Sequence, residues 1–470
     1  MTSAPRLRRR PAGRLGPAQA ILRLSGPQLL VGSFAGLIVL GTCALRLLPG
    51  LYVGPGLGWL DSLFTATSAV CVTGLIVVDT ATYFTPAGQL LLLLLIQLGG
   101  LGMITLSTAI ILALGGRLTL GQEEVSAPGV HLLPGGDLRR LTGHVVLFTV
   151  VFELAGAAVL TALWTPRFGL ARAAWHALFQ SVSAFCNAGF STFSDSLTSF
   201  AEGLPTILVM AALIVAGGLG FLTIEELLAR RRRRTHRSRL TLHTRLVLVT
   251  TAVLLLVGWA LYGALEWHGA LAGLGPTDRV ANALFMSVTA RTAGFNTVDY
   301  ASVSAGGGFL TVLLMTVGGS PGSTAGGLKT TTLAVVVLLA WSRVRGRRAT
   351  HAGDRSIPDE TVQRAVGLVV FAGFVVVGAI FLVAAREMDG GEAGANLGFL
   401  RYAFETVSAF NTVGLSMGVT GDLDRTGRLV AIVLMFLGRV GPLTFTAAVA
   451  RRARRPAAGF RYAHEDVVVG

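Results

Sequence analysis

The hydrophobic pattern alternates long apolar runs with short stretches of small, weakly polar residues. Uninterrupted apolar segments of spanning length occur at residues 29–48, 88–114, 143–164, 205–228, 244–265, 309–340, 363–385 and 429–450. A helix needs about 20 residues to cross the roughly 30 Å hydrocarbon core of a bilayer. The pattern therefore predicts eight spans and an all-α, polytopic membrane protein.

One short motif occurs four times, once between the two spans of each successive pair. It begins with Phe, continues through a segment of the S/T-V-S/T-A kind, and closes on Gly followed by Leu or Phe. The copies are FTATSAVCVTGL (Phe64 to Leu75), FQSVSAFCNAGF (Phe179 to Phe190), FMSVTARTAGF (Phe285 to Phe295) and FETVSAFNTVGL (Phe404 to Leu415). About ten residues of helix reach about 15 Å, half the membrane, so each copy is predicted to form a re-entrant pore helix that ends in an extended loop.

Four such loops, related by internal repetition, would most simply surround one axis. Non-helical backbone at membrane depth is tolerated where protein buries it or water lines it. Backbone carbonyls could replace the water around a cation, and the carboxyl-terminal ends of the short helices would add negative potential. The closing glycines would keep the passage open and permit positive φ. The alternative is that these glycines only allow close helix packing.

The sequence thus predicts four units of helix, pore helix and helix (M1-P-M2) with pseudo-fourfold symmetry around one pore. The predicted boundaries are 1–28 for a basic N-terminus, 29–116, 117–236, 237–350 and 351–450 for the four units, and 451–470 for a tail. A second motif recurs in the last helix of each unit, as GGLGMIT (Gly99 to Thr105), GGLGFLT (Gly217 to Thr223), GGSPGST (Gly318 to Thr324) and GRVGPLT (Gly438 to Thr444). Small residues there permit bending or close approach.

Composition and charge narrow the functional classes. Hydrophobic residues make up 52% of the chain and charged residues 13%, where about a quarter is usual in soluble domains. The net charge of +15 comes from arginines between the spans, so it indicates topology rather than a nucleic acid partner. These arginines fall on one side, which the positive-inside rule makes cytoplasmic, together with both termini. The cysteines Cys43, Cys71 and Cys186 suggest neither a disulfide framework nor a metal site.

The third and fourth units depart from the pattern at one level of the membrane. The stretch GGSPGSTAGGLK cannot continue as a membrane helix, so we expect an intramembrane loop below the pore helices. Arg439 replaces a glycine in an apolar helix, where a guanidinium needs a partner or water. The predicted gate comprises Gly318, Gly319, Ser320, Pro321, Gly322, Ser323, Thr324, Ala325, Gly326, Gly327, Lys329 and Arg439. The alternatives are an Arg439 that snorkels to the cytoplasm and a Lys329 that serves only as a helix-end charge.

Three further features need an interpretation. The loop resembles G-x-x-x-x-G-K-[ST], but Leu328 interrupts that match, so nucleotide binding is not expected there. Arg291 would block cations if it pointed inward, so we expect it behind the loops, paired with a carboxylate such as Glu405. Glu153 stands alone in the third span, either as a functional group or as a hydrogen-bond partner of a re-entrant loop.

Two other functional classes remain as alternatives to a pore. A secondary cation transporter with broken helices would have repeats in inverted topology, whereas all four units begin on the same side. An intramembrane enzyme would need paired carboxylates or a His/Ser/Cys constellation within the spans, and the sequence offers neither. No enzymatic activity is expected.

The loops VTGL, CNAGF, RTAGFNT and NTVGL, with GGSPGSTAGGLKT and Arg439, resemble the Trk/Ktr/HKT superfamily of potassium transporters. The resemblance covers residues from about 29 to 450 and is closest to the Ktr-type membrane subunit, because only about 28 residues precede the first span. It implies potassium uptake across the plasma membrane without a cofactor. It also implies a homodimer with one pore per protomer and a cytosolic nucleotide-binding regulatory subunit of the RCK type. Dependence on sodium as an activator stays open.

The resemblance also implies which residues coordinate potassium through their backbone. They are Val72, Thr73 and Gly74, then Asn187, Ala188 and Gly189, then Thr292, Ala293 and Gly294, then Thr412, Val413 and Gly414. In the family, a serine in place of the first filter glycine accompanies sodium permeation. Gly74 therefore favours potassium.

Overall fold

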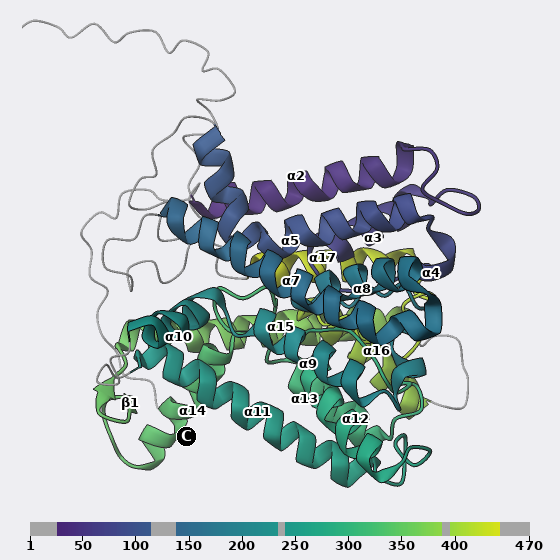
Figure 1. Ribbon diagram of the computed structural model, residues 1–470. Helices are drawn as coiled ribbons and strands as arrows, with labels where there is room; N and C mark the ends of the chain where they lie inside the picture. Colours follow the sequence, from purple (N-terminus) through teal and green to yellow (C-terminus); the bar gives the residue numbers. More distant parts are fainter. Residues whose placement is uncertain (1–25, 114–137, 234–239, 388–394, 442–470) are drawn as a thin grey trace, which may run out of the picture.

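The computed structural model describes residues 26–113, 138–233, 240–387 and 395–441, and these are almost entirely helical (Figure 1). Four of the described helices are long and apolar enough to cross a membrane. They are α2 (Gly26–Leu47), α7 (Leu138–Phe168), α11 (Leu242–Glu266) and α15 (Asp359–Glu387). The fold is therefore that of a helical membrane protein.

A shorter helix follows each of these long helices and carries one copy of the Phe-to-Gly motif. The four are α3 (Trp59–Val70), α8 (Leu170–Phe185), α12 (Pro276–Thr289) and α16 (Ala395–Phe410). We call them the short helices. Their 12 to 16 residues correspond to about 18–24 Å. They are longer than the sequence motif suggested because each begins well before its Phe.

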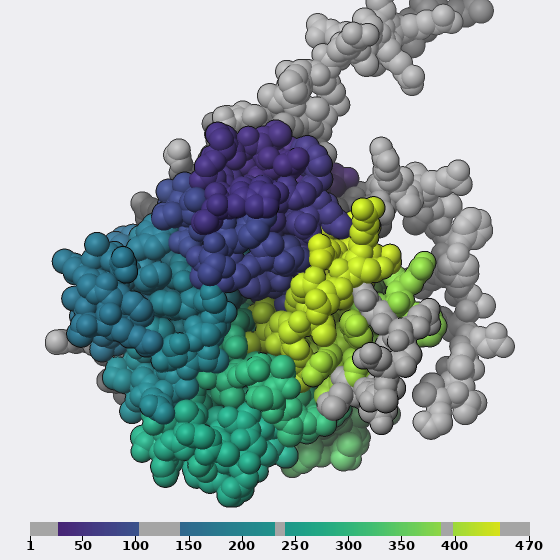
Figure 2. Space-filling model, turned by 90° about the vertical axis from the view of Figure 1, so that its right-hand side faces the viewer, coloured from purple at the N-terminus to yellow at the C-terminus, as the bar shows by residue number. Residues whose placement is uncertain are grey.

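A further helical segment completes each set of three. These segments are α5 (Pro86–Ala113), α9 (Leu204–Gly218) with α10 (Phe221–Arg233), α13 (Ala305–Met315) with α14 (Thr330–Val344), and α17 (Arg425–Val440). The remaining elements are α4 (Thr80–Tyr83), η2 (Thr198–Phe200), and the antiparallel strands β1 (His351–Ala352) and β2 (Arg355–Ser356) between α14 and α15. In Figure 2, successive parts of the chain, from purple through teal and green to yellow, follow one another around the visible face.

The apolar segment 205–228, predicted as one span with small residues that permit bending, forms two helices with a sharp bend between them. The axes of α9 and α10 differ by 98°. Gly220 lies at the break with a φ of +86°, which favours glycine. The nitrogen of Ser320 donates to the carbonyl of Gly218 at 2.9 Å, so a neighbouring loop takes the place of the helical hydrogen bonds. The predicted break within 309–340 is confirmed, because α13 ends at Met315 and α14 begins at Thr330.

The glycines of the second motif lie against the ends of the short helices. A β-carbon on Gly99 would lie 2.7 Å from the carbonyl carbon of Val70, one on Gly217 3.0 Å from that of Phe185, and one on Gly438 2.7 Å from that of Phe410. Val70 and Phe185 end their helices, and Phe410 ends α16, so the three contacts are equivalent. Close approach, one of the two roles expected for these glycines, is therefore present.

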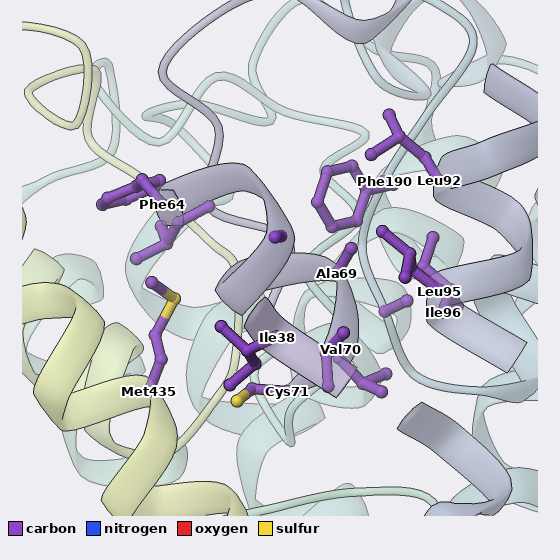
Figure 3. Packing of buried hydrophobic residues seen from close by; sticks show 14 of the residues in the cluster. Ile38, Phe64, Ala69, Val70, Cys71, Leu92, Leu95, Ile96, Phe190 and Met435 are labelled. Carbon is purple, nitrogen blue, oxygen red and sulfur yellow. The ribbon is translucent and has the colours of Figure 1, made fainter. Parts of the chain in front are cut away.

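Buried apolar side chains fix the short helices against their neighbours. In Figure 3, Phe64 and Val70 of α3 lie among Ile38 of α2, Leu95 of α5 and Met435 of α17. Phe64 and Met435 are fully buried. The core thus joins the beginning of the described chain to its end, which closes the arrangement seen in Figure 2.

We predict that Gly438→Ala lowers the thermal stability of the detergent-solubilised protein. The added methyl group would overlap the backbone of Phe410, and overpacking a tight contact costs about 1–3 kcal/mol. Gly378→Ala in α15 is the matched control, because nothing lies within 4 Å of its β-carbon position. Alanine should stabilise that helix slightly. Equal melting temperatures for both variants would contradict the proposed contact.

Candidate functional site

The four closing glycines of the Phe-to-Gly motif lie next to one another in a ring. All four have positive φ, between +71° and +93°. A β-carbon on Gly74 would lie 3.0 Å from the Cα of Gly189, one on Gly189 2.8 Å from the Cα of Gly294, one on Gly294 3.2 Å from the Cα of Gly414, and one on Gly414 3.1 Å from the Cα of Gly74. Each glycine therefore touches the next, and the fourth touches the first. We call this arrangement the glycine ring.

A second left-handed residue precedes each ring glycine by two positions. These residues are Val72, Asn187, Thr292 and Thr412, with φ between +51° and +67°. Positive φ is strained for residues other than glycine, and most so for β-branched ones. Both left-handed positions lie in the loop that follows each short helix. The sequence motif did not predict this strain, because Val and Thr rarely adopt positive φ and their presence therefore does not indicate it.

Hydroxyl groups near the end of each short helix fasten the loop that follows. They belong to Ser68, Ser183, Thr289 and Ser408, the second S/T of the motif. Ser68 and Ser408 accept hydrogen bonds from the nitrogens of Gly74 and Gly414 at 3.1 Å, while Ser183 and Thr289 donate to the carbonyls of Phe190 and Phe295 at 2.7 and 2.5 Å. The recurring hydroxyl was visible in the sequence, but its bond to the loop was not.

A funnel of about 510 Å³ opens onto one side of the glycine ring. Three aspartates line it, Asp79, Asp195 and Asp299, and none of the described lining residues is Lys or Arg. Burial alone would raise the pKa of Asp195, but hydrogen bonds from Ser199 and Thr198 outweigh that effect and lower it. Asp195 is therefore an anion at neutral pH, and the funnel favours cations.

The loop between α13 and α14 lies on the other side of the glycine ring. It approaches three of the four left-handed residues. A β-carbon on Gly318 would lie 3.2 Å from Cγ2 of Thr292, one on Gly326 3.2 Å from Cβ of Thr412, and Oγ1 of Thr324 lies 3.5 Å from Oδ1 of Asn187. The same hydroxyl donates to the carbonyl of Phe185 at 3.0 Å. This segment, residues 318–329, is here called the central loop.

Arg439 is almost completely buried, with 1% of its surface exposed, and joins the central loop to α5. Its guanidinium donates to the carbonyl of Thr324, to that of Gly99 at 2.6 Å and to that of Gly100 at 3.3 Å. A buried guanidinium costs several kcal/mol unless such partners are present. The backbone of α5 and the central loop supplies them. The expectation that loop carbonyls are partners of Arg439 is confirmed. The alternative, that the side chain of Arg439 snorkels to the cytoplasm, is wrong.

Comparison with known proteins places this geometry in a family. The family model TrkH, described as a cation transport protein, matches residues 33–458. The chain belongs to the TrkH family.

Individual members of the TrkH family align with nearly the whole chain. The potassium/sodium uptake protein NtpJ of Enterococcus hirae is 38% identical over 95% of this chain and 98% of its own length. The Ktr system potassium uptake proteins B of Vibrio alginolyticus and Bacillus subtilis are 38% and 36% identical, over 90% and 96% of this chain and 91% and 98% of their own lengths. The crystal structure of the potassium transporter TrkH from Vibrio parahaemolyticus shares the fold, with a TM-score of 0.70 at 20% identity over 95% of this chain and 88% of that one.

The proposed pairing of Arg291 with Glu405 is absent from this TrkH family member. Glu405 instead accepts hydrogen bonds from the nitrogen of Met417 at 3.1 Å and the hydroxyl of Thr420 at 2.8 Å. Arg291 donates to the carbonyl of Gly318 at 3.4 Å. The prediction is wrong because the chain that follows α16 folds back and satisfies the carboxylate itself. Arg291 is buried, and this hydrogen bond joins it to the central loop.

Glu153 of α7 has the hydrogen-bonding role that was one of its two interpretations. Its carboxylate accepts from Nε2 of Gln97 at 3.1 Å and from the thiol of Cys186 at 3.7 Å. Cys186 directly precedes the left-handed Asn187, so Glu153 is a hydrogen-bond partner of the loop that follows α8. Lys329 directly precedes α14, and its ammonium group donates to the carbonyl of Ala325 at 2.7 Å, within the central loop.

We predict that Ser408→Ala lowers thermal stability and the rate of cation transport by this TrkH family member. The alanine leaves the buried nitrogen of Gly414 without its acceptor, which costs about 1–3 kcal/mol. Ser408→Thr retains the hydroxyl and should behave like the wild type. Ser342→Ala in α14, another buried serine, is the control distant from the ring. Unchanged transport by Ser408→Ala would show that the hydroxyl does not position the loop.

Proposed function

We propose that this chain is the pore-forming subunit of a potassium uptake system in the cell membrane. The support is the juxtaposition of the four closing glycines in one ring, together with relatives at 36–38% identity that are named potassium uptake proteins. Four units of helix, pore helix and helix would then surround a single pore. The observed order of long helix, short helix and third segment, repeated four times, supports that arrangement.

The selectivity filter would use backbone oxygens of the residues at and before the ring glycines. The positive φ at both the ring glycine and the residue two before it, which all four loops share, supports this assignment. Carbonyls held in fixed positions can replace the hydration shell of potassium. The short helices end at the ring, so their negative ends face the passing cation. The aspartate-lined funnel would raise the local concentration of cations at the outer entrance.

The gate would be the central loop together with Arg439. A cation 4 Å from this guanidinium is repelled by about 4 kcal/mol at an effective dielectric of 20. The contacts of the loop with Asn187, Thr292 and Thr412 support a closed passage in the described conformation. Opening would require the loop to leave these contacts and to release the bonds between Arg439 and Thr324.

The orientation and the assembly follow from the same proposal. The arginine-rich links and both termini would face the cytoplasm. Several relatives are named as proteins of a Ktr system, which supports a regulatory partner for this chain. We propose a cytosolic nucleotide-binding subunit of the RCK type and a homodimer with one pore in each protomer.

We predict that the wild-type chain restores growth and potassium uptake to a cell that lacks its own potassium transport. Gly74→Ser should lower the preference for potassium over sodium by about tenfold, equivalent to about 1.4 kcal/mol. A side chain on Gly74 would meet the backbone of Ala188 and disturb the ring. Gly36→Ser in α2 is the control, because its β-carbon position is open.

In the uptake experiment, the uptake by each variant is normalised to the amount of that variant in the membrane fraction. Sodium uptake is measured alongside potassium uptake, because one relative is named a potassium/sodium uptake protein. Absence of potassium uptake by the wild type would contradict the proposed function. An unaltered ion preference in Gly74→Ser, at normal membrane levels, would contradict the filter assignment alone.

We predict that Arg439→Ala raises potassium flux through the purified protein in liposomes several-fold. The substitution removes the positive charge and frees the carbonyl of Thr324. Arg364→Ala on the exposed face of α15 is the control, because that exposed arginine pairs with Glu360 one turn away. Flux equal to that of the wild type would remove Arg439 from the gate.

A further inference from the structure

A groove of about 410 Å³ lies between α7 and α10, outside the site described above. Its walls are apolar, with Val145, Phe148 and Val151 from α7 facing Phe221 and Leu228 from α10. The groove exists because α10 turns away by 98° after Gly218 instead of continuing along the direction of α9. In Figure 1, α10 accordingly lies apart from the bundle formed by α7, α8 and α9. A volume of this size is typical of small-molecule sites.

The mouth of the groove is polar and lies near positive charge. His144 and Glu225 face each other there, 3.5 Å apart. Arg230 follows directly after the lining residue Ala229, and it begins an unbroken run of five arginines in the sequence. The occupant best suited to an apolar groove that ends near several arginines is an amphiphile with a negatively charged head.

The groove is connected to the gate by direct contacts. The nitrogen of Phe221, the first residue of α10, donates to the carbonyl of Gly322 in the central loop at 3.0 Å. The ring of Phe148 lies 6.3 Å from that of Phe221 and 6.0 Å from that of Phe185. The carbonyl of Phe185 in turn accepts the hydroxyl of Thr324. The α10 wall of the groove therefore contacts the central loop, and the α7 wall contacts the end of a short helix.

We propose that this groove binds one acyl chain of an anionic phospholipid, with the headgroup at Arg230. The lipid holds α10 against the loop and so favours the described, closed conformation. The proposal rests on the proposed function, because it concerns regulation of the same pore. A ligand shifts a conformational equilibrium only through its different affinity for the two states. Here the difference arises because loop opening releases Phe221 and changes the wall of the groove.

The experiment compares potassium flux in vesicles of phosphatidylcholine alone with flux in vesicles that also contain phosphatidylglycerol. For the wild type, flux should be about fivefold lower with the anionic lipid, at the weak end of typical coupling between sites. Leu228→Trp should fill the groove and give low flux in both kinds of vesicle. Arg230→Gln should give high flux in both, because the headgroup loses its cation.

Leu256→Trp is the matched control, because Leu256 is exposed on α11 away from the groove. It should respond to the anionic lipid like the wild type. Native mass spectrometry should in addition find phosphatidylglycerol retained by the wild type and by Leu256→Trp, but less by Leu228→Trp. Equal wild-type flux in both kinds of vesicle, or an undiminished lipid response in both groove variants, would overturn the proposal. No potassium flux in any vesicle would instead contradict the proposed function.

Discussion

The structure depends on one constraint, the approach of four backbone segments to a distance at which no side chain fits between them. Gly74, Gly189, Gly294 and Gly414 each leave about 3 Å between a notional β-carbon and the next segment. Such an approach places backbone polar groups where they lack ordinary secondary-structure partners. The short helices and the hydroxyls near their ends hold the four segments at that distance, and in three copies a glycine of a neighbouring helix contacts the end of the short helix.

Arg439 shows how a costly group can organise its surroundings. Its guanidinium donates to main-chain carbonyls, which come from the middle of α5 and from the central loop. Gly99 and Gly100 carry no side chains that could cover their carbonyls, and the central loop is not helical. The guanidinium of Arg439 thus joins two parts of the chain that are far apart in sequence. It has no carboxylate partner among the described residues.

The features that could be predicted from the sequence are those that depend on interactions between residues close in sequence. The four-copy motif, the glycine positions and the break after Met315 could be predicted, because each reflects a rule that acts over a few residues. At Gly220 the sequence indicated only that the glycines of the motif permit a bend, whereas the bend itself depends on Pro321 and Ser320, which pack beside it. The partner of Glu405 was missed for a similar reason, because it depends on how the following loop folds back. The positive φ of Val72 and its three counterparts is contrary to the backbone preferences of these residue types. Tertiary contacts alone therefore require that conformation.

The four left-handed residues that precede the ring glycines have different side chains: an aliphatic one at Val72, an amide at Asn187, and hydroxyls at Thr292 and Thr412. An assembly of four identical subunits would carry any substitution at this level in all its quadrants at once. A chain that encodes every quadrant separately can change one of them and leave the other three untouched. Evolution can therefore adjust the chemistry at the inner end of the ring in single steps, and an engineer can introduce one reporter group there without repeating it around the axis.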